Sequence, residues 1–188
     1  MRFSRSDESR VALWWYTVDH LLLTSILILA GVGVVLSLAA SPEVALRKGL
    51  PTFYFFERHL FFSAMGLGVM GALSFLSPTA VRRLALAIFL AAVCALVLVA
   101  IAGVETNGAK RWLFIAGYSL QPSEFAKPAF VVICAWLFAE AQRREDMPAL
   151  PLAVALLAIL AGLLSGQPDI GQTRLVVVTW GALYALSG

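Results

Sequence analysis

Six long apolar runs, separated by shorter polar stretches, dominate the hydrophobic pattern of the chain. Within each run the apolar residues are continuous rather than alternating, which favours helices over strands. Each run is close to the roughly 17 to 25 residues that a helix needs to cross the hydrocarbon core of a bilayer. The fourth run reaches this length only if the preceding QPSE segment belongs to the same helix. We predict spans at about residues 21–40, 60–76, 84–104, 125–139, 149–165 and 170–186.

The fold predicted from these runs is all-α, a polytopic transmembrane bundle forming a single membrane domain over residues 1–188. Backbone groups in lipid must be hydrogen-bonded within their own segment, and the absence of alternation excludes an outer-membrane barrel. The first run is longer than the apolar part of a signal peptide and follows the residues WWY, so we interpret it as an uncleaved span. After the sixth run the sequence stops at ALYALSG, and we expect a longer protein truncated at its C-terminus.

Composition agrees with a membrane protein and limits the classes of partner. The chain is 61% hydrophobic and 13% charged, outside the usual range of soluble domains. A net charge of +3 suggests attraction to anionic headgroups or diphosphates rather than nucleic acid. Cys94 and Cys134 lie in the middle of predicted spans with no metal-ligand spacing, so we interpret both as packing residues.

The distribution of basic residues predicts the orientation in the membrane. Counted by alternating loops, seven Arg or Lys residues fall on the side of the N-terminus and five on the other side. Because cytoplasmic loops carry the excess of Lys and Arg, the N-terminus is predicted to be cytoplasmic. The segment Glu105–Leu120 is then outside, with a turn at Asn107 and Gly108, and we expect it to lie along the outer interface.

Two short stretches resemble each other, SLQPSEF before the fourth span and SGQPDIG before the sixth. Each is predicted to place Gln-Pro at a helix start with a carboxylate just after it, Glu124 in one and Asp169 in the other. Both spans begin on the same side of the membrane, so the two carboxylates are expected at similar depth. A purely structural role is open for each, because a carboxylate in the first turn faces the positive end of the helix dipole and Asp169 can be an N-cap.

Lys127 does not fit that structural explanation. A cation in the first turns opposes the helix dipole, and Pro128 removes a backbone donor directly after it. Either Lys127 and Glu124, one turn apart, only neutralise each other for insertion, or both line a site for a polar or anionic ligand on the outer side. Arg174 leaves a similar choice, since it either extends outward to the interface or faces the same cavity.

The chain closely resembles the shape, elongation, division and sporulation family of bacterial membrane proteins. The resemblance lies in the order and spacing of three stretches, NGAKRW, SLQPSEFAKPAF and SGQPDIGQT. The N-terminal RVALWWYTVDHLLL and the later VVLSLAASP resemble the cell-division branch of the family rather than the elongation branch. The resemblance covers essentially the whole chain and implies the N-terminal half of a fold of about ten spans.

The resemblance implies a peptidoglycan glycosyltransferase that polymerises lipid II at the outer face of the bacterial cytoplasmic membrane, at the division septum. A sugar hydroxyl would attack an anomeric carbon while undecaprenyl diphosphate leaves. A carboxylate would act as base, and cations, or a divalent metal in the complete enzyme, would stabilise the diphosphate. No cofactor is expected in this chain. The implied partners are a class B penicillin-binding protein, other membrane proteins of the division machinery and membrane lipid, with no nucleic acid.

Carried over residue by residue, the resemblance implies a substrate cavity and candidate residues in an outer loop. The cavity residues are Gln121, Pro122, Ser123, Glu124, Lys127 and Asp169. The loop candidates are Asn107, Gly108, Arg111 and Trp112. The aspartate proposed as catalytic in the family lies beyond residue 188, so the 188 residues alone are expected to be inactive. Arg174 departs from the apolar or small residue expected there.

Two other functions are compatible with these residues. One is a transporter of lipid-linked sugars, which also accounts for charged residues in a membrane cavity. The other is a non-catalytic assembly subunit that recruits its penicillin-binding partner.

Overall fold

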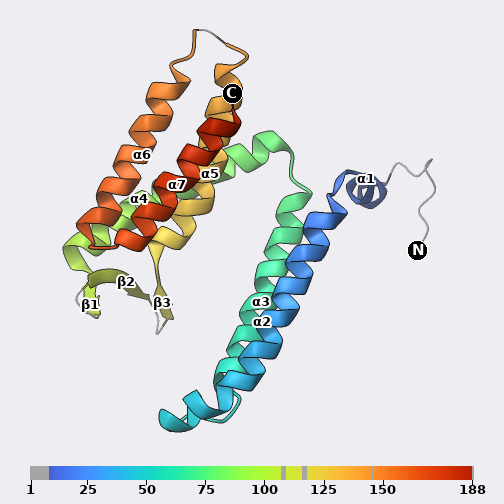
Figure 1. The fold of residues 1–188 in the computed structure, drawn as a ribbon, viewed down its shortest axis with the longest axis vertical. Helices are drawn as coiled ribbons and strands as arrows, with labels where there is room; N and C mark the ends of the chain where they lie inside the picture. The colour runs from blue at the N-terminus through green and yellow to red at the C-terminus, as the bar shows by residue number, and fades with distance from the viewer. Residues whose placement is uncertain (1–8, 107–108, 116–117, 145, 188) are drawn as a thin grey trace. The chain divides into compact units, whose positions relative to one another are not determined.

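The computed structural model describes residues 9–106, 109–115, 118–144 and 146–187 (Figure 1). In these residues it contains seven helices and three short strands. They fall into two compact units, Met1–Ser77 and Pro78–Gly188. Each unit is described by itself below.

The first unit consists of a short helix followed by a pair of long helices. The short helix is α1 (Arg10–Thr17), and the long ones are α2 (His20–Arg47) and α3 (Tyr54–Ser74), which run side by side (Figure 1). Helix α2 begins because the Asp19 carboxylate accepts a hydrogen bond from the backbone N–H of Leu22. It ends at Arg47 with Lys48 as its C-cap, and the next residue, Gly49, has a φ of 66°, the left-handed conformation that follows many helices.

Side-chain hydrogen bonds hold the helices of the first unit together at both ends. The Ser41 hydroxyl accepts from the backbone N–H of Phe56 at 3.1 Å, which joins the end of α2 to the start of α3. At the other end the indole N–H of Trp14 donates to Ser74 Oγ at 2.7 Å, and its ring stacks on Phe75 at 5.1 Å between centroids. The short helix α1, which the sequence analysis did not predict, is thereby tied to the end of α3.

Four helices make up most of the second unit (Figure 1), namely α4 (Pro78–Ala102), α5 (Pro122–Ala141), α6 (Ala149–Gly166) and α7 (Ile170–Leu186). Helix α5 contacts the other three and is the most extensively buried of them. The core around it is apolar, with small and large side chains interleaved. Its most buried members include Leu96, Ala126, Phe130, Cys134, Leu160 and Leu164.

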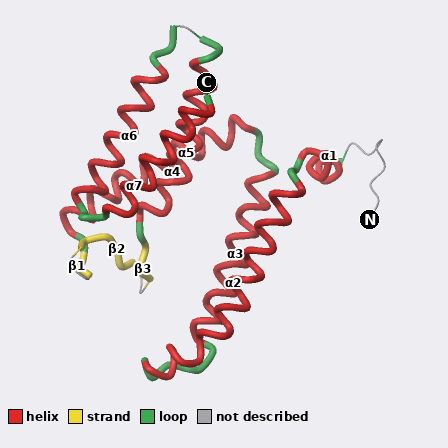
Figure 2. Tube along the Cα trace, in the orientation of Figure 1, coloured by secondary structure: helices red, strands yellow, loops and turns green. Residues whose placement is uncertain are grey.

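A three-stranded antiparallel sheet lies between α4 and α5 in the sequence and at one end of these helices (Figure 2). Its strands are β1 (Val104–Thr106), β2 (Ala109–Ile115) and β3 (Tyr118–Leu120), in the order β1-β2-β3. The sequence analysis placed this segment at the outer interface without predicting strands. The Asn-Gly pair between β1 and β2, which lies outside the described residues, is a frequent hairpin signal.

Six of the helices coincide with the six predicted spans. Three of them are long and apolar enough by length and composition to cross a membrane, at His20–Arg47, Pro78–Ile101 and Ala149–Gly166. The other three are α3, α5 and α7. Helix α5 begins at Pro122, as the length argument for the fourth span required, and α7 has 17 residues, the lower end of the spanning range.

Candidate functional site

The start of α5 is built from the QPSEFAKP stretch. Gln121 is the N-cap without a side-chain capping bond, and Pro122 occupies the first turn, where its missing N–H costs little. Glu124 lies in the same turn and faces the positive end of the helix dipole. Pro128 continues the helix but has no N–H to donate to the carbonyl of Glu124. Lys127 therefore lies in a part of the helix that is both electropositive and incompletely hydrogen-bonded.

The ammonium group of Lys127 donates hydrogen bonds to two side-chain oxygen atoms. Its Nζ donates to Glu124 Oε1 at 2.8 Å and to Gln172 Oε1 of α7 at 2.6 Å. The amide nitrogen of Gln172 in turn donates to Glu124 Oε1 at 3.4 Å. The Lys127 side chain is 18% exposed, whereas that of Glu124 is 50% exposed. Lys127 thus connects α5 to α7, and Glu124 stands at the open edge of this contact.

Asp169 forms the second half of the arrangement. As the N-cap of α7 it accepts from the backbone N–H of Gln172 at 3.4 Å, so the structural role left open by the sequence is present. Its other oxygen lies 3.6 Å from Arg111 Nε of β2, and Arg111 also donates to the carbonyl of Pro168 at 3.0 Å. Asp169 is only 7% exposed. The sheet is therefore attached to the turn between α6 and α7 through a largely buried carboxylate.

Together these side chains make one connected group, which we call the polar cluster: Arg111, Glu124, Lys127, Asp169 and Gln172. The negative charges of its two carboxylates offset the positive charges of its two cations, which lowers the free-energy cost of placing charges among apolar helices. Glu124, Lys127 and Asp169 were predicted to lie on one side of the membrane, whereas Gln172 was not predicted as a site residue. A signal for Gln172 was present, since it lies three residues after Asp169 and hence on the same face of the helix.

The two Gln-Pro pairs, which lie in similar stretches of sequence, have different structural positions. Gln121 and Pro122 begin α5, whereas Gln167 is the C-cap of α6 and the helix α7 starts only at Ile170. Gln167 is buried, and its side-chain nitrogen donates to the carbonyl of Leu96 in α4 at 3.0 Å. The expectation that both pairs stand at a helix start is wrong for the second, because its residues close the turn between two helices.

The remaining predicted residues take different positions. Ser123 is buried, and its hydroxyl has no hydrogen-bond partner among the described residues. Trp112 is half-buried in β2 opposite Val104. Asn107 and Gly108 lie outside the described residues.

Arg174 is exposed on the face of α7 that carries Ile170 and Val178, 63% and 68% exposed. These residues lie one turn before and one turn after it. Arg174 lies two positions after Gln172, and at about 100° per residue this places it on a different face of α7 from the polar cluster. Arg174 therefore does not join the polar cluster among the described residues, and its extension to the interface stays a prediction.

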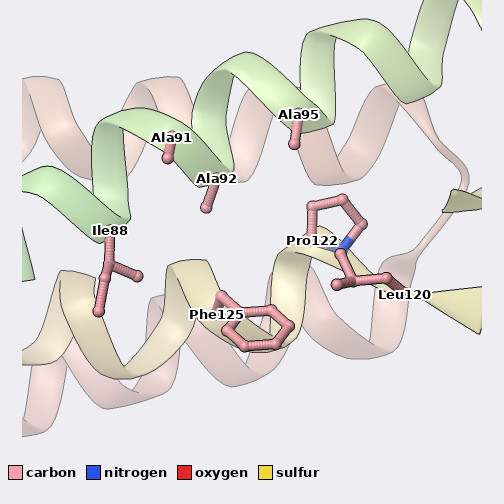
Figure 3. A pocket seen from close by; sticks show the side chains of 7 residues that line it. All are labelled: Ile88, Ala91, Ala92, Ala95, Leu120, Pro122 and Phe125. Carbon is pink, nitrogen blue, oxygen red and sulfur yellow. The ribbon is translucent and has the colours of Figure 1, made fainter. Parts of the chain in front are cut away.

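An apolar cavity of about 290 Å³ lies beside the start of α5. Figure 3 shows α4 presenting three alanines to it across from Phe125. Pro122 and Phe125 of α5 line it together with Leu120 of β3 and Ile88, Ala91, Ala92 and Ala95 of α4. The first two turns of α5 therefore carry polar cluster residues on one face and an apolar cavity on another.

The same residues were also candidates for binding a metal ion. Over the described part of the chain, no three His, Cys, Asp or Glu side chains come together as ligands for a metal ion. The two carboxylates of the polar cluster already face Lys127 and Arg111. These residues do not fit a metal centre.

Comparison with known proteins places the chain among bacterial cell cycle proteins. It is 41% identical over 187 residues to a probable peptidoglycan glycosyltransferase FtsW of Caulobacter vibrioides, covering 99% of the chain and 48% of that protein. A protein of the same name from Halorhodospira halophila is 33% identical over 178 residues, covering 93% of the chain and 45% of the relative. The chain thus spans about half the length of the curated relatives it matches.

Solved structures agree in fold. A chain from a study titled "Structural coordination of polymerization and crosslinking by a peptidoglycan synthase complex" matches with a TM-score of 0.67 and 26% identity, over 87% of this chain and 46% of that one. The rod shape determining protein RodA of Thermus thermophilus matches with a TM-score of 0.63 and 26% identity, over 92% and 60%. These matches confirm the predicted helical membrane fold.

Residues 19–188 match the sequence family of FtsW, RodA and SpoVE, described as cell cycle proteins. This match covers most of the chain and includes every helix from α2 to α7. The resemblance inferred from the three polar motifs is therefore confirmed. The chain belongs to the FtsW/RodA/SpoVE family of cell cycle proteins.

Proposed function

We propose that the complete protein containing this chain is a peptidoglycan glycosyltransferase. It polymerises lipid II at the outer face of the bacterial cytoplasmic membrane during septal wall synthesis, together with a class B penicillin-binding protein. Membership of the family and the names of the relatives support the class of reaction. The observation that carries the proposal is Lys127, a largely buried cation held between Glu124 and Gln172 beside an apolar cavity.

This geometry suits a substrate that is polar at one end and apolar at the other. The ammonium group of Lys127 has three N–H donors, and contacts to described residues use two of them. The third is available for an oxygen atom of a sugar or diphosphate. Glu124 accepts its hydrogen bonds within the polar cluster at one oxygen, Oε1. Hydrocarbon of a lipid-linked substrate would occupy the cavity lined by Pro122 and Phe125.

The role proposed for this half of the protein is to bind and orient the substrate. Asp169 is a poor candidate for a base, because it is buried, caps α7 and faces Arg111. Lys127 and Arg111 supply positive charge at the outer end of the helices, where an anionic diphosphate would be stabilised as it leaves. The base that removes the hydroxyl proton is expected in the part of the protein beyond residue 188.

The experiment compares two charge-removing double variants of the complete protein. Glu124→Gln with Lys127→Met removes the pair at the start of α5. Glu140→Gln with Arg144→Met removes an ion pair of 3.3 Å at the other end of the same helix and is the matched control. Purified proteins are incubated with labelled lipid II and the class B partner, and glycan strands are separated on a gel. We expect loss of strands only for the first variant, at equal amounts of folded protein by gel filtration.

The same preparations distinguish polymerisation from transport. Vesicles loaded with fluorescent lipid II report its movement between leaflets, independently of strand formation. If the variant Glu124→Gln with Lys127→Met polymerises at the parental rate, the polar cluster has only a structural role. Transport without any strand formation by the parental protein would instead establish the transporter.

A further inference from the structure

A second cavity of the Pro78–Gly188 unit lies between the first turns of α4 and the last turns of α5. Its volume is about 280 Å³, and it is lined by Thr79, Arg82, Arg83, Leu86, Ile133 and Trp136. Helix α4 has 25 residues and leads into the sheet at its far end, so about 37 Å of helix separates the two ends. This cavity shares no lining residue with the apolar cavity beside the start of α5, and none of its lining residues belongs to the polar cluster.

Arg82 is held in the cavity wall by contacts that provide no counter-ion for its charge among the described residues. Its guanidinium lies 5.4 Å from the centre of the Trp136 ring, and Nη2 donates to Thr79 Oγ1 at 3.1 Å. Arg83 follows directly and is exposed. Neither arginine takes part in an ion pair with any described carboxylate. A ring contact orients a guanidinium but does not neutralise it, so two adjacent positive charges face this cavity.

The rest of the wall decides which kind of anion fits. Leu86 and Ile133 present hydrocarbon next to the arginines, and the Trp136 ring continues the apolar surface. A free phosphate ion would satisfy the arginines but leave this apolar wall exposed. A ligand that joins a negative phosphate to a hydrocarbon chain satisfies both parts of the wall.

The orientation predicted from the basic residues gives the source of such a ligand. This end of α4 and α5 also carries Arg143 and Arg144 in the turn after α5. By the excess of Lys and Arg it is the cytoplasmic end, where the inner leaflet supplies anionic phospholipids.

We infer that this cavity is a binding site for an anionic glycerophospholipid. The phosphate lies on Arg82 and Arg83, and an acyl chain lies against Leu86 and Ile133. The arginine–tryptophan contact fixes the guanidinium at the membrane surface, and Thr79 holds its other side. The site is independent of the proposed glycosyltransferase activity, since it shares no residue with the polar cluster.

The test measures lipid retained by the purified 188-residue chain in neutral detergent, by native mass spectrometry during titration with phosphatidylglycerol. Each basic side chain near an anionic surface contributes about a fivefold gain in affinity, so Arg82→Gln with Arg83→Gln should weaken binding roughly 25-fold. Arg143→Gln with Arg144→Gln removes the same charge at the same end, outside the cavity, and should weaken binding at most about twofold. The exposed single change Arg83→Gln keeps the Trp136 contact and should cost about fivefold.

Two further arms separate the lipid from other ligands. Phosphatidylcholine, which has the same phosphodiester but no net charge, should bind more weakly than phosphatidylglycerol. Inorganic phosphate at millimolar concentration should leave the bound lipid in place, and displacement would assign the arginines to a free anion. Equal losses for the two arginine pairs, or no loss for either, would overturn the inference. Circular dichroism of every variant excludes loss of helix as the cause.

Discussion

The contact between Lys127 and Gln172 gives a prediction about the stability of the α5–α7 contact. The short donor–acceptor distance of 2.6 Å and the low exposure of Lys127 make it a charge-assisted bond between two helices. Hydrogen bonds to charged groups contribute about 1.5 to 3 kcal/mol in proteins generally. Polar pairs between membrane helices average roughly 0.6 kcal/mol and reach about 1.7. We therefore expect a coupling of about 1 to 2 kcal/mol between Lys127 and Gln172.

The neighbouring pair of Lys127 with Glu124 should be weaker, although both contacts use the same ammonium group. Glu124 is 50% exposed and lies on the same helix, three residues away. Ion pairs of this kind contribute about 0.2 to 1 kcal/mol because water screens the carboxylate. The structure thus ranks the bond across the helices above the pair within the helix.

The assay is a pair of double-mutant cycles on the purified chain in detergent. Lys127→Met is combined with Gln172→Leu in one cycle and with Glu124→Gln in the other. The free energy of unfolding is measured by titration with SDS and followed by circular dichroism. Each coupling energy is the part of the double variant's effect that the two single variants do not account for.

A coupling to Gln172 that is no larger than the coupling to Glu124 would refute this ranking. It would mean that Lys127 is compensated within its own helix and that its contact with α7 is incidental. The same measurement bears on the insertion hypothesis, because a pair that only neutralises itself predicts that removing both charges is harmless. With Gln172 as a partner, removing both charges still leaves an amide oxygen without its donor.

Further predictions concern the other parts of the chain. Asp169→Ala should lose about 1 kcal/mol of stability because it removes the cap of α7, whereas Asp169→Asn should keep most of it because asparagine caps helices equally well. Both variants should lose the attraction to Arg111. Thermal unfolding measures the difference in stability between the two variants. In a cysteine-free background, a cysteine at Lys110 should react with an impermeant thiol reagent in intact cells and one at Ala141 should not, whereas the reverse labelling would invert the topology. The 188 residues alone should form no glycan strands from lipid II with the class B partner, and strands from the purified chain would place the chemistry within these helices.

The helices were predictable because each apolar run encodes its own span. In lipid the backbone has few alternatives to a helix, so the length and composition of each run locate α2 to α7 without knowledge of the neighbouring helices. The ends were less predictable. Helix α2 continues through Pro42 to Arg47, several residues past the predicted end at residue 40, because the apolar run stops before the hydrogen-bonded helix does.

The polar cluster was predictable only in part. Asp169 as a cap and the Lys127–Glu124 pair depend on spacing within one segment, which sequence shows directly. The bond from Lys127 to Gln172 joins residues 45 positions apart and requires that α7 pack beside α5. The resemblance of the two Gln-Pro stretches was misleading for the same reason. The same two residues begin a helix in one stretch and follow the end of a helix in the other, because they pack against different parts of the chain.

A lysine in the first turns of α5 opposes the helix dipole, and the structure shows what offsets this cost. Glu124 alone would neutralise the charge, but a side chain that is half exposed does so weakly. Gln172 adds a neutral oxygen from another helix, which fixes the position of the ammonium group without cancelling its charge. If Lys127 were needed only for insertion, a fixed position and a retained positive charge would give no advantage. For a residue that presents a cation to an anionic substrate both are useful, since a preorganised charge needs no rearrangement when negative charge develops. The third N–H of Lys127 is therefore where a substrate oxygen is expected.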